Sequence, residues 1–322
     1  MNHTTNKINL HAVIPIDFAG LRFDQALAKL FPDYSRARLQ DWLKSGKILI
    51  NGQILPGKNK VQGGESVSVD ANLDIENTWS AEEIQLNILY EDGALLVINK
   101  PVGMVVHPGA GNRSGTLLNA LLHHCPILAT VPRAGIVHRL DKDTSGVLVI
   151  AKTLPVHHAL VSQLQKRKIE REYRAIVCGV MTGGGTVDEP IGRHPKHRTK
   201  MAVIDTGKPA VTHYRVIERF RKHTYIKLLL ETGRTHQIRV HMAYIHYPIL
   251  GDVQYNPRLA IPKNAGMVFS QALKSFKRQA LHAFRLTLKH PLTAELMSFE
   301  APLPQDLLNM LELLKNDNQE EE

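Results

Sequence analysis

The segment HRLDKDTSG, residues 138–146, is the part of the sequence best suited to chemistry. Its Asp141 lies close along the chain to His138 and Arg139, and positive or protonatable neighbours favour the ionised form of a carboxyl group. The apolar run Val147–Ala151 that follows predicts a buried strand. Loops beside rigid strands commonly present catalytic groups, and a carboxylate there can act as a nucleophile or as a base. Taken alone, the same aspartate could simply cap a turn.

Other patterns exclude several kinds of site. The glycines at 109, 111 and 115 have neither of the spacings that cradle a nucleotide phosphate. None of the closest histidine groupings has the H-E-x-x-H spacing or a matching cysteine set, so no metal is predicted. Cys125 and Cys178 lie far apart in the sequence, which argues against a disulfide framework and a zinc–cysteine site. No cofactor is therefore predicted.

The charge of the chain points to a polyanionic partner. The 322 residues carry a net charge of +10, and residues 161–241 alone hold 17 Lys and Arg against 7 Asp and Glu. Residues 20–70 are also basic, with 8 such residues against 5 acidic ones. This distribution indicates nucleic acid or an anionic membrane surface as partner. The alternative is that a basic surface only keeps the protein soluble.

The length and the apolar runs indicate a globular protein of one or two domains. Hydrophobic residues make up 43% of the sequence, enough for a buried core. The apolar runs are far shorter than a membrane span, and the N-terminal residues MNHTTNKINL lack a signal-peptide pattern. We therefore expect a cytoplasmic protein that does not enter the membrane.

The N-terminal region predicts a helix, a turn, a second helix and a strand. In RFDQALAKLF, from Arg22, the apolar residues fall on one helical face. Ser35 is a suitable N-cap for a second helix at residues 36–44. The string KILING then predicts a short strand that enters an Asn51-Gly52 turn, a strong hairpin signal.

This pattern resembles the S4 RNA-binding module, in which two short helices and a small hairpin present basic residues to folded RNA. The resemblance predicts an S4-like RNA-binding domain at residues 20–70, with RNA contacts from four basic side chains: Arg22, Arg36, Arg38 and Lys44. Arginine suits phosphate, as do helix N-termini. The alternative is a small helix–hairpin domain whose charges are merely solvated. The acidic stretch that follows predicts a linker at residues 71–86, and the terminal NDNQEEE predicts a frayed tail.

Residues 87–322 predict a second, larger domain. ILYEDGALLVINKP reads as two strand segments around an Asp92-Gly93 turn, and VVHPGAGNRSGTLLNALLHHC as a loop followed by a helix. Three further blocks follow in order: REYRAIVCG from Arg171, ETGRTHQIRVHMAYIHYPILGD from Glu231, and RQALHAFRLTLKHP from Arg278.

Together with HRLDKDTSG, these blocks resemble the RluA-type pseudouridine synthases, in order and across nearly the whole of the second domain. The resemblance implies an α+β fold: an S4-like domain, then a catalytic domain with a mixed, largely antiparallel sheet, and a basic cleft over Asp141. It implies an RNA pseudouridine synthase, an isomerase that needs no cofactor. The reaction cuts the bond from ribose C1′ to uracil N1 and rejoins the base through C5.

The resemblance also assigns catalytic roles to three residues. Asp141 matches the essential aspartate, which either adds to the sugar or removes a sugar proton. Arg239 matches the arginine that pairs with it, and a two-point guanidinium contact would hold the carboxylate ionised; its alternative role is a phosphate contact. Tyr173 matches the active-site tyrosine, which can stack on uracil and assist proton removal from C5; its alternative is a core aromatic. The preceding Glu172 departs from the small or polar residue expected there.

Two further residues are predicted to contact RNA next to the catalytic aspartate. A uridine in a folded stem-loop must leave its stack before a carboxylate can reach C1′. Arg139 matches the family residue that fills the vacated space, and its alternative role is a phosphate clamp. His138 is the second predicted RNA contact.

Within the family, strings such as VHPGAGN and GKPAVTHYR resemble members that act on large-subunit (23S) ribosomal RNA at the stem-loop called helix 69. We therefore expect that RNA, or a pre-ribosomal particle, as partner of a monomeric enzyme. Three alternatives are a noncatalytic ribosomal RNA-binding or assembly factor, a glycosidic-bond hydrolase, and a sister synthase with another RNA target. The hydrolase is disfavoured because such chemistry usually needs two carboxylates or a metal.

Overall fold

A computed structural model of the chain describes residues 7–32, 34, 36–72, 79–109, 111–197, 199–256 and 259–319. These residues form two compact units. Unit 1 is drawn from Met1–Thr78 and Ile127–Pro132, and unit 2 from Trp79–Pro126 and Arg133–Glu322. The predicted S4-like domain at residues 20–70 lies within unit 1, and the predicted catalytic domain at residues 87–322 lies within unit 2 except for Ile127–Pro132.

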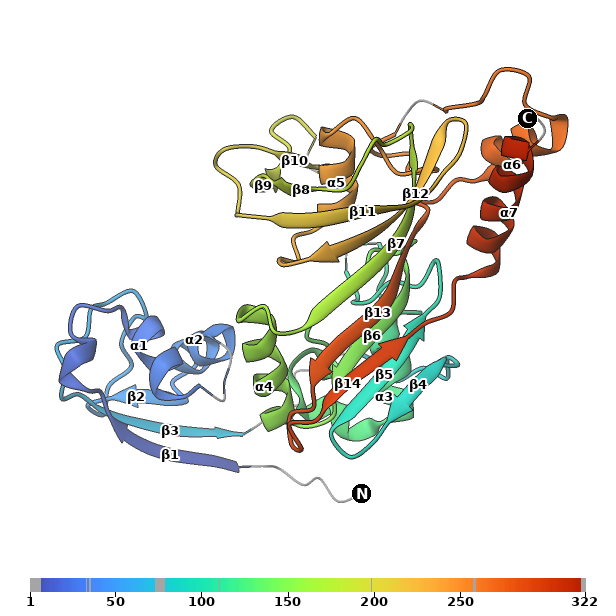
Figure 1. Cartoon of the computed structure of the whole chain (residues 1–322). Coiled ribbons are helices and arrows are strands. Elements are labelled where there is room, and N and C mark those ends of the chain that lie inside the picture. The colour runs from blue at the N-terminus through green and yellow to red at the C-terminus, as the bar shows by residue number, and fades with distance from the viewer. Residues whose placement is uncertain are drawn as a thin grey trace. The chain divides into compact units, whose positions relative to one another are not determined.

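Unit 1 consists of two helices on a small antiparallel sheet (Figure 1). Its elements are β1 (Lys7–Val13), α1 (Phe23–Leu30), α2 (Arg36–Lys44), β2 (Ile48–Ile50) and β3 (Ser66–Asn72), and the strand order is β1-β3-β2. The predicted apolar stripe of the first helix is buried: Phe23, Ala26 and Leu27 are at most 4% exposed. The predicted second helix at residues 36–44 is confirmed by α2. Ser35, its predicted cap, lies outside the described residues.

The predicted hairpin turn is present, but the strand before it pairs with a more distant strand. Asn51 and Gly52 both have positive φ, 49° and 76°, as a tight two-residue hairpin turn requires. Ile50 and Gln53 exchange backbone hydrogen bonds across it at 2.9 and 3.0 Å. The ladder partner of β2 is the more distant β3, whose other edge pairs with β1. The sheet therefore begins at Lys7, earlier than the predicted boundary at residue 20.

The predicted linker at residues 71–86 is a packed segment where the structure describes its second half. The Glu82 N–H donates to the Asn119 carbonyl at 3.1 Å, and Asn119 Nδ2 donates to the Ser80 carbonyl at 2.7 Å. The Glu82 carboxylate in turn accepts from the Gly115 N–H at 2.9 Å. Glu82 belongs to the acidic stretch that predicted a linker. In the structure its carboxylate accepts from a backbone N–H beside a helix.

Unit 2 is built around one large sheet with helices beside it. Its strands are β4 (Ile88–Glu91), β5 (Leu95–Lys100), β6 (Ser145–Ala151), β7 (Glu170–Cys178), β8 (Gly185–Asp188), β9 (Ile191–Arg193), β10 (Met201–Val203), β11 (Val211–Arg219), β12 (His223–Leu230), β13 (Leu281–Lys289) and β14 (Leu296–Glu300). Its helices are α3 (Leu117–His124), α4 (Leu154–Gln165), α5 (Gln237–Tyr244), α6 (Met267–Ser275) and α7 (Gln305–Gln319). Short 3-10 helices of the chain occupy Ile16–Phe18, Pro126–Thr130 and Pro132–Gly135.

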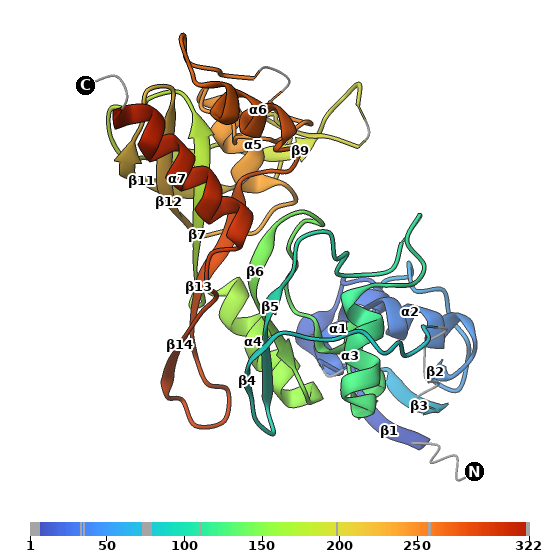
Figure 2. The same cartoon turned by 90° about the vertical axis from the view of Figure 1, so that its right-hand side faces the viewer.

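The large sheet is mixed and mostly antiparallel, which confirms the predicted fold class. The strand order is β4-β5-β6-β13-β7-β12-β11-β8, with β14 paired to β13, and the β6–β13 pairing is parallel. Figures 1 and 2 show β7 and β13 running through the middle of the unit, with α4 beside β6 and α5 near β11. The strands β9 and β10 form a separate antiparallel hairpin.

The strand that carries the catalytic loop is the most deeply buried one. All seven residues of β6 are buried, and Leu148, Val149 and Ile150 have no exposed surface. A continuous apolar run of this length is typical of a strand covered on both faces.

None of the helices that the structure describes is long and apolar enough to cross a membrane.

Candidate active site

Asp141 lies in a turn directly before β6. The Thr144 N–H donates to the Asp141 carbonyl at 3.1 Å, and Leu140 beside it is only 4% exposed. Gly146, at the start of the strand, has a φ of 117°, and a Cβ there would lie 2.1 Å from the Ala283 carbonyl oxygen of β13. Glycine therefore allows β6 and β13 to approach closely. The Asp141 side chain remains 19% exposed, so its carboxylate can be reached from outside.

Arg239 on α5 contacts Asp141, as predicted, but with one nitrogen. Its Nη1 donates to Asp141 Oδ2 at 3.0 Å. The expected two-point contact is made instead to Asp252, through Nε at 2.6 Å and Nη2 at 2.9 Å. Nη2 also donates to Gln254 Oε1 at 3.0 Å. The prediction of a two-point clamp on Asp141 was wrong, because a more deeply buried carboxylate occupies the other edge of the guanidinium.

Asp252 is the residue that orients this arginine, and sequence reasoning did not identify it. It is 1% exposed, and its Oδ1 also accepts from the backbone N–H groups of Gln254 and Tyr255. Burial by itself would lower the pKa of Arg239, but the bonds with Asp252 and Asp141 raise it above its ordinary value. Arg239 therefore stays charged next to Asp141. The one signal in the sequence was an aspartate in a Gly-Asp pair after the helix block.

Tyr173 lies on β7, with Ala283 on one neighbouring strand and Leu228 on the other opposite it. Its side chain is 7% exposed. Burial raises its pKa; the charge of Arg171 opposes this, and the charge of Asp141 adds to it. The phenol is therefore protonated near neutral pH. Its burial alone would suit a core aromatic, but its pKa also responds to the charge of the candidate catalytic group.

The two predicted RNA contacts before Asp141 differ in exposure and bonding. Arg139 is exposed. Burial lowers the pKa of His107 and of His236, and the positive charge of Arg139 also lowers both. The ring of His138 instead accepts a hydrogen bond at Nε2 from the Val149 N–H at 3.1 Å. Burial lowers the pKa of His138 to about 3, so it carries no charge that could attract phosphate. Its contact with RNA stays a prediction, and its bonding in the structure supports the β6 backbone.

Lys100, the last residue of β5, connects the catalytic loop to the neighbouring strand. Its side chain is fully buried, and its Nζ donates to the carbonyls of Pro101, Met104 and Lys142 at 2.7, 2.9 and 3.0 Å. Burial lowers its pKa to about 8, although the charge of Asp143 opposes this. Sequence reasoning did not identify this residue. Its only signal was a lysine at the end of an otherwise apolar strand.

Two of the four predicted RNA contacts of unit 1, Arg22 and Arg36, share one buried carboxylate. Asp24 accepts from Arg22 at 3.2 Å, from Arg36 at 2.7 Å and from Gln40 at 2.6 Å. Burial alone would raise the pKa of Asp24, but these bonds lower it. The two arginine side chains remain 49% and 47% exposed, so both guanidinium groups are oriented and still accessible to phosphate. The other two predicted contacts are on α2, where Lys44 is exposed and Arg38 partly buried.

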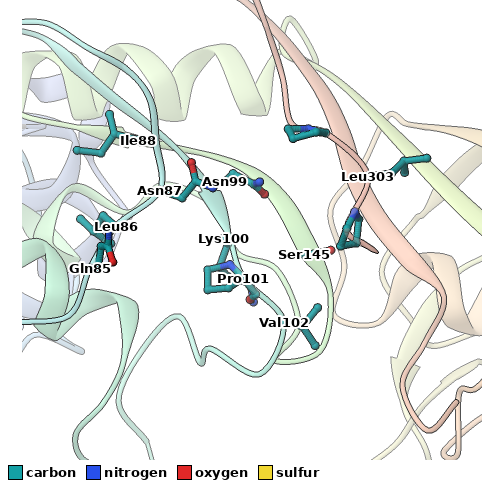
Figure 3. A pocket seen from close by; sticks show the side chains of 12 residues that line it. Gln85, Leu86, Asn87, Ile88, Asn99, Lys100, Pro101, Val102, Ser145 and Leu303 are labelled. Atoms are coloured by element: carbon teal, nitrogen blue, oxygen red, sulfur yellow. The ribbon is translucent and has the colours of Figure 1, made fainter. Parts of the chain in front are cut away.

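A cavity of about 680 Å³ lies between the end of β5, the segment before β4 and the segment after β14 (Figure 3). Asn87, Asn99, Lys100, Ser145 and Leu303 are among its lining residues. No carboxylate lines it, and its one titratable side chain, Lys100, donates to backbone carbonyls. The cavity therefore does not include the groups around Asp141. In the part of the chain that the structure describes, no cluster of His, Cys, Asp and Glu could hold a metal ion.

The sequence comparisons agree with this geometry. The pattern described as RNA pseudouridylate synthase matches residues 94–244, and the S4 domain pattern matches residues 21–67. The chain is 57% identical over 314 residues to "Ribosomal large subunit pseudouridine synthase D" of Pasteurella multocida, covering 97% of each chain. It is 53% identical over 315 residues to the protein of that name from Escherichia coli K12, covering 98% of this chain and 97% of that one. The chain belongs to the RNA pseudouridine synthase family.

This pseudouridine synthase is also similar to a solved human structure. "Human RNA Pseudouridylate Synthase Domain Containing 4" is 29% identical, with a TM-score of 0.56 and coverage of 71% of this chain and 93% of that chain. The relatives confirm the resemblance to RluA-type enzymes. The bacterial ones, named ribosomal large subunit pseudouridine synthase D, confirm the closer resemblance to members that act on large-subunit ribosomal RNA. The protein is therefore an isomerase with an S4 RNA-binding domain, not a noncatalytic binding factor.

Proposed function

We propose that this pseudouridine synthase isomerises specific uridines of large-subunit (23S) ribosomal RNA, in the stem-loop called helix 69. The bacterial relatives carry the name of ribosomal large subunit enzymes, and the strings VHPGAGN and GKPAVTHYR resemble members that act there. The enzyme works as a monomer in the cytoplasm, on the free RNA or on a pre-ribosomal particle.

The observation that carries the mechanism is the 3.0 Å contact between Arg239 and Asp141. A guanidinium that is itself fixed by Asp252 holds the carboxylate in one orientation. Asp141 then starts the reaction at the sugar, either by adding to C1′ or by removing a sugar proton. In both cases the C1′–N1 bond breaks, the base turns, and C5 bonds to C1′. At that step either the Asp141–C1′ bond breaks again or Asp141 returns the proton to the sugar.

Completing the reaction requires loss of the C5 proton and protonation of N1. Tyr173, whose pKa responds to the charge of Asp141, can assist the first step, because its phenol can exchange a proton with the base. Its aromatic face can also stack on the extruded uracil. The atoms balance without an outside reactant, since the proton lost from C5 equals the one gained at N1.

Access to the uridine requires base flipping, which we assign to Arg139. Its exposed side chain lies two residues before Asp141, where it can fill the space that the base leaves. Arg22 and Arg36 in unit 1 contribute phosphate contacts, oriented by Asp24.

The test combines a gene deletion with one isosteric substitution. In cells lacking the protein, pseudouridine should disappear from helix 69, and the wild-type gene should restore it. A gene with Asp141→Asn should not restore it. The amide oxygen can still accept from Arg239, but the amide cannot act as a nucleophile or a base. Its turnover on purified RNA should fall at least about 1000-fold, as when a catalytic nucleophile is removed.

Asp143→Asn, on the same loop, is the matched control and should retain most activity. If helix 69 stays modified in the deletion strain while another site is lost, the proposed target is wrong. If Asp141→Asn keeps more than about a hundredth of wild-type turnover, the catalytic assignment of Asp141 is wrong.

A further inference from the structure

The hydroxyl of Tyr255 connects the β9–β10 hairpin to a histidine beside the catalytic carboxylate. Its Oη accepts a hydrogen bond from the Met201 N–H, the first residue of β10, at 2.9 Å. The same oxygen lies 2.8 Å from Nδ1 of His236. The Arg239 guanidinium lies over the Tyr255 ring, 5.0 Å from its centre. One tyrosine therefore contacts the hairpin, the histidine and the arginine that pairs with Asp141.

These contacts favour one position for the ring proton of His236. Tyr255 accepts from the Met201 N–H and can donate its own proton to His236 Nδ1. In that arrangement Nε2, which lies 3.8 Å from Asp141 Oδ1, carries the ring proton. The opposite tautomer would point a lone pair at a carboxylate, which is unfavourable.

His236 is neutral rather than a cation in this arrangement. Burial lowers its pKa; the charge of Asp141 opposes this, as does that of Asp252, while Arg239 and Arg139 lower it further. The contact with Asp141 is therefore not an ion pair. At 3.8 Å it is a dipole facing a carboxylate, and a shift of less than an ångström would make it a hydrogen bond. Catalytic hydrogen bonds are often longer before substrate binds.

The backbone supports a positioning role for this histidine. His236 precedes α5 with a φ of 56° and a ψ of 21°, the left-handed region that few residues other than glycine adopt and in which asparagine, aspartate and histidine are enriched. This conformation sets the direction in which the side chain leaves the backbone. Asparagine, which tolerates this region, provides a substitution with little backbone strain.

We propose that Tyr255 and His236 are positioning residues, through which the β9–β10 hairpin directs a His236 Nε2–H toward Asp141 and fixes the carboxylate for reaction. This inference rests on the proposed role of Asp141. Neither residue is assigned contact with the RNA. Their loss is therefore expected to lower turnover without weakening substrate binding.

Two substitutions of His236 separate its two nitrogens. Asn places an amide near the position of Nδ1, keeps the contact with Tyr255 and has nothing at the position of Nε2. Gln reaches the position of Nε2 and can still donate toward Asp141. His236→Asn should lower kcat about 10- to 100-fold with little change in KM, and His236→Gln should recover part of that loss.

Tyr255→Phe keeps the ring under Arg239 and removes only the hydroxyl. It should lower kcat by a similar factor. The double variant Tyr255→Phe with His236→Asn should lose little more activity than His236→Asn, because both residues act through the contact of His236 with Asp141. His246→Asn is the matched control, since His246 is an exposed histidine at the end of α5 with a φ of 66°. It should leave both constants unchanged.

A spectroscopic measurement tests the proposal without a variant. Long-range ¹H–¹⁵N correlation spectra of the wild-type enzyme distinguish the two neutral tautomers, and His236 should show the Nε2–H form near neutral pH. The Nδ1–H form would overturn the proposal. So would near-normal kcat in His236→Asn, or a rise in KM alone, which would indicate direct RNA contact. The activity of Asp141→Asn on the same RNA tests the proposed function itself. A failure of the positioning proposal can therefore be distinguished from a failure of the proposed function.

Discussion

The Arg239 side chain donates hydrogen bonds to three acceptor groups that are buried to different extents. Its guanidinium donates to Asp252, which is 1% exposed, to Asp141 and to Gln254. The buried carboxylate fixes the arginine, and the arginine then orients the more exposed Asp141. A planar group with several fixed donors can do this, and an ammonium cannot.

Replacing Arg239 with Lys should therefore lower kcat about 100-fold or more, although the charge is kept. KM for RNA, and the salt dependence of binding, should change little, because the guanidinium donates to Asp252, Asp141 and Gln254. Gln254→Ala, which removes one acceptor and no ion pair, is the comparison and should cost much less. Steady-state kinetics at several salt concentrations will test this. A normal kcat with a salt slope reduced by about 0.7 to 0.9 would favour the phosphate contact instead.

At the scale of elements, the end of β5 and the loop before β6 are joined by a buried ammonium group. Strand pairing aligns β5 with β6 up to Lys100 and Gly146, but it does not hold the loop that contains Asp141. Lys100 does so by donating to the carbonyl of Lys142 and to two carbonyls of its own loop. The catalytic loop is thus positioned by a lysine 42 residues earlier in the sequence.

Lys100→Met should lower the free energy of unfolding by about 2 to 4 kcal/mol, because it leaves buried carbonyls without a donor. Methionine has a similar volume, so no large cavity forms. Urea denaturation at several pH values will measure the effect. The folded pKa of about 8 lies below the unfolded value of 10.5, so the unfolded chain binds more protons between these values. The wild type should therefore gain stability over Lys100→Met as pH rises from 8 to 10.5. Equal stability throughout would show that the loop is held by other contacts.

At the scale of the whole molecule, unit 2 contains several histidines that burial keeps neutral. The pKa of His138 is lowered to about 3, and that of each of four others to about 4; these four are His107, His157, His223 and His282. In unit 1 the carboxyls of Asp24 and Glu65 have lowered pKa values instead. The two units therefore respond to acid over different pH ranges.

Unit 2 should lose stability first on acidification. Its unfolded chain takes up protons on these histidines from pH 6.5 downward, while the folded unit does not until about pH 4, so stability falls across that range. Its Tm should drop by about 10 °C or more over that range. The stability that Asp24 and Glu65 contribute is lost only at lower pH, as the pH falls through their folded pKa values.

The two tryptophans of the chain separate the units, since Trp42 is in unit 1 and Trp79 in unit 2. Thermal melts followed by fluorescence of Trp79→Phe report unit 1, and those of Trp42→Phe report unit 2. A Tm of unit 2 that stays constant from pH 6.5 to 4 would contradict this prediction.

The sequence by itself determined the elements whose formation depends on neighbouring residues. The spacing of apolar residues predicted α2, the Asn51-Gly52 pair predicted a turn, and an apolar run predicted β6. Each depends on periodicity or on backbone conformations that a few adjacent residues decide. The motif around Asp141 also predicted its pairing with Arg239, through the resemblance to a family.

Only the tertiary structure decided which groups share each contact. Arg239 lies 98 residues from Asp141, and it was the fold that gave its two-point contact to Asp252. The sequence likewise could not show that Lys100 holds the catalytic loop or that β1 pairs with β3. Such contacts depend on strand order and burial, since a buried polar group bonds to whichever partner folding brings within reach. Local sequence specifies the donors and acceptors, but not their pairing.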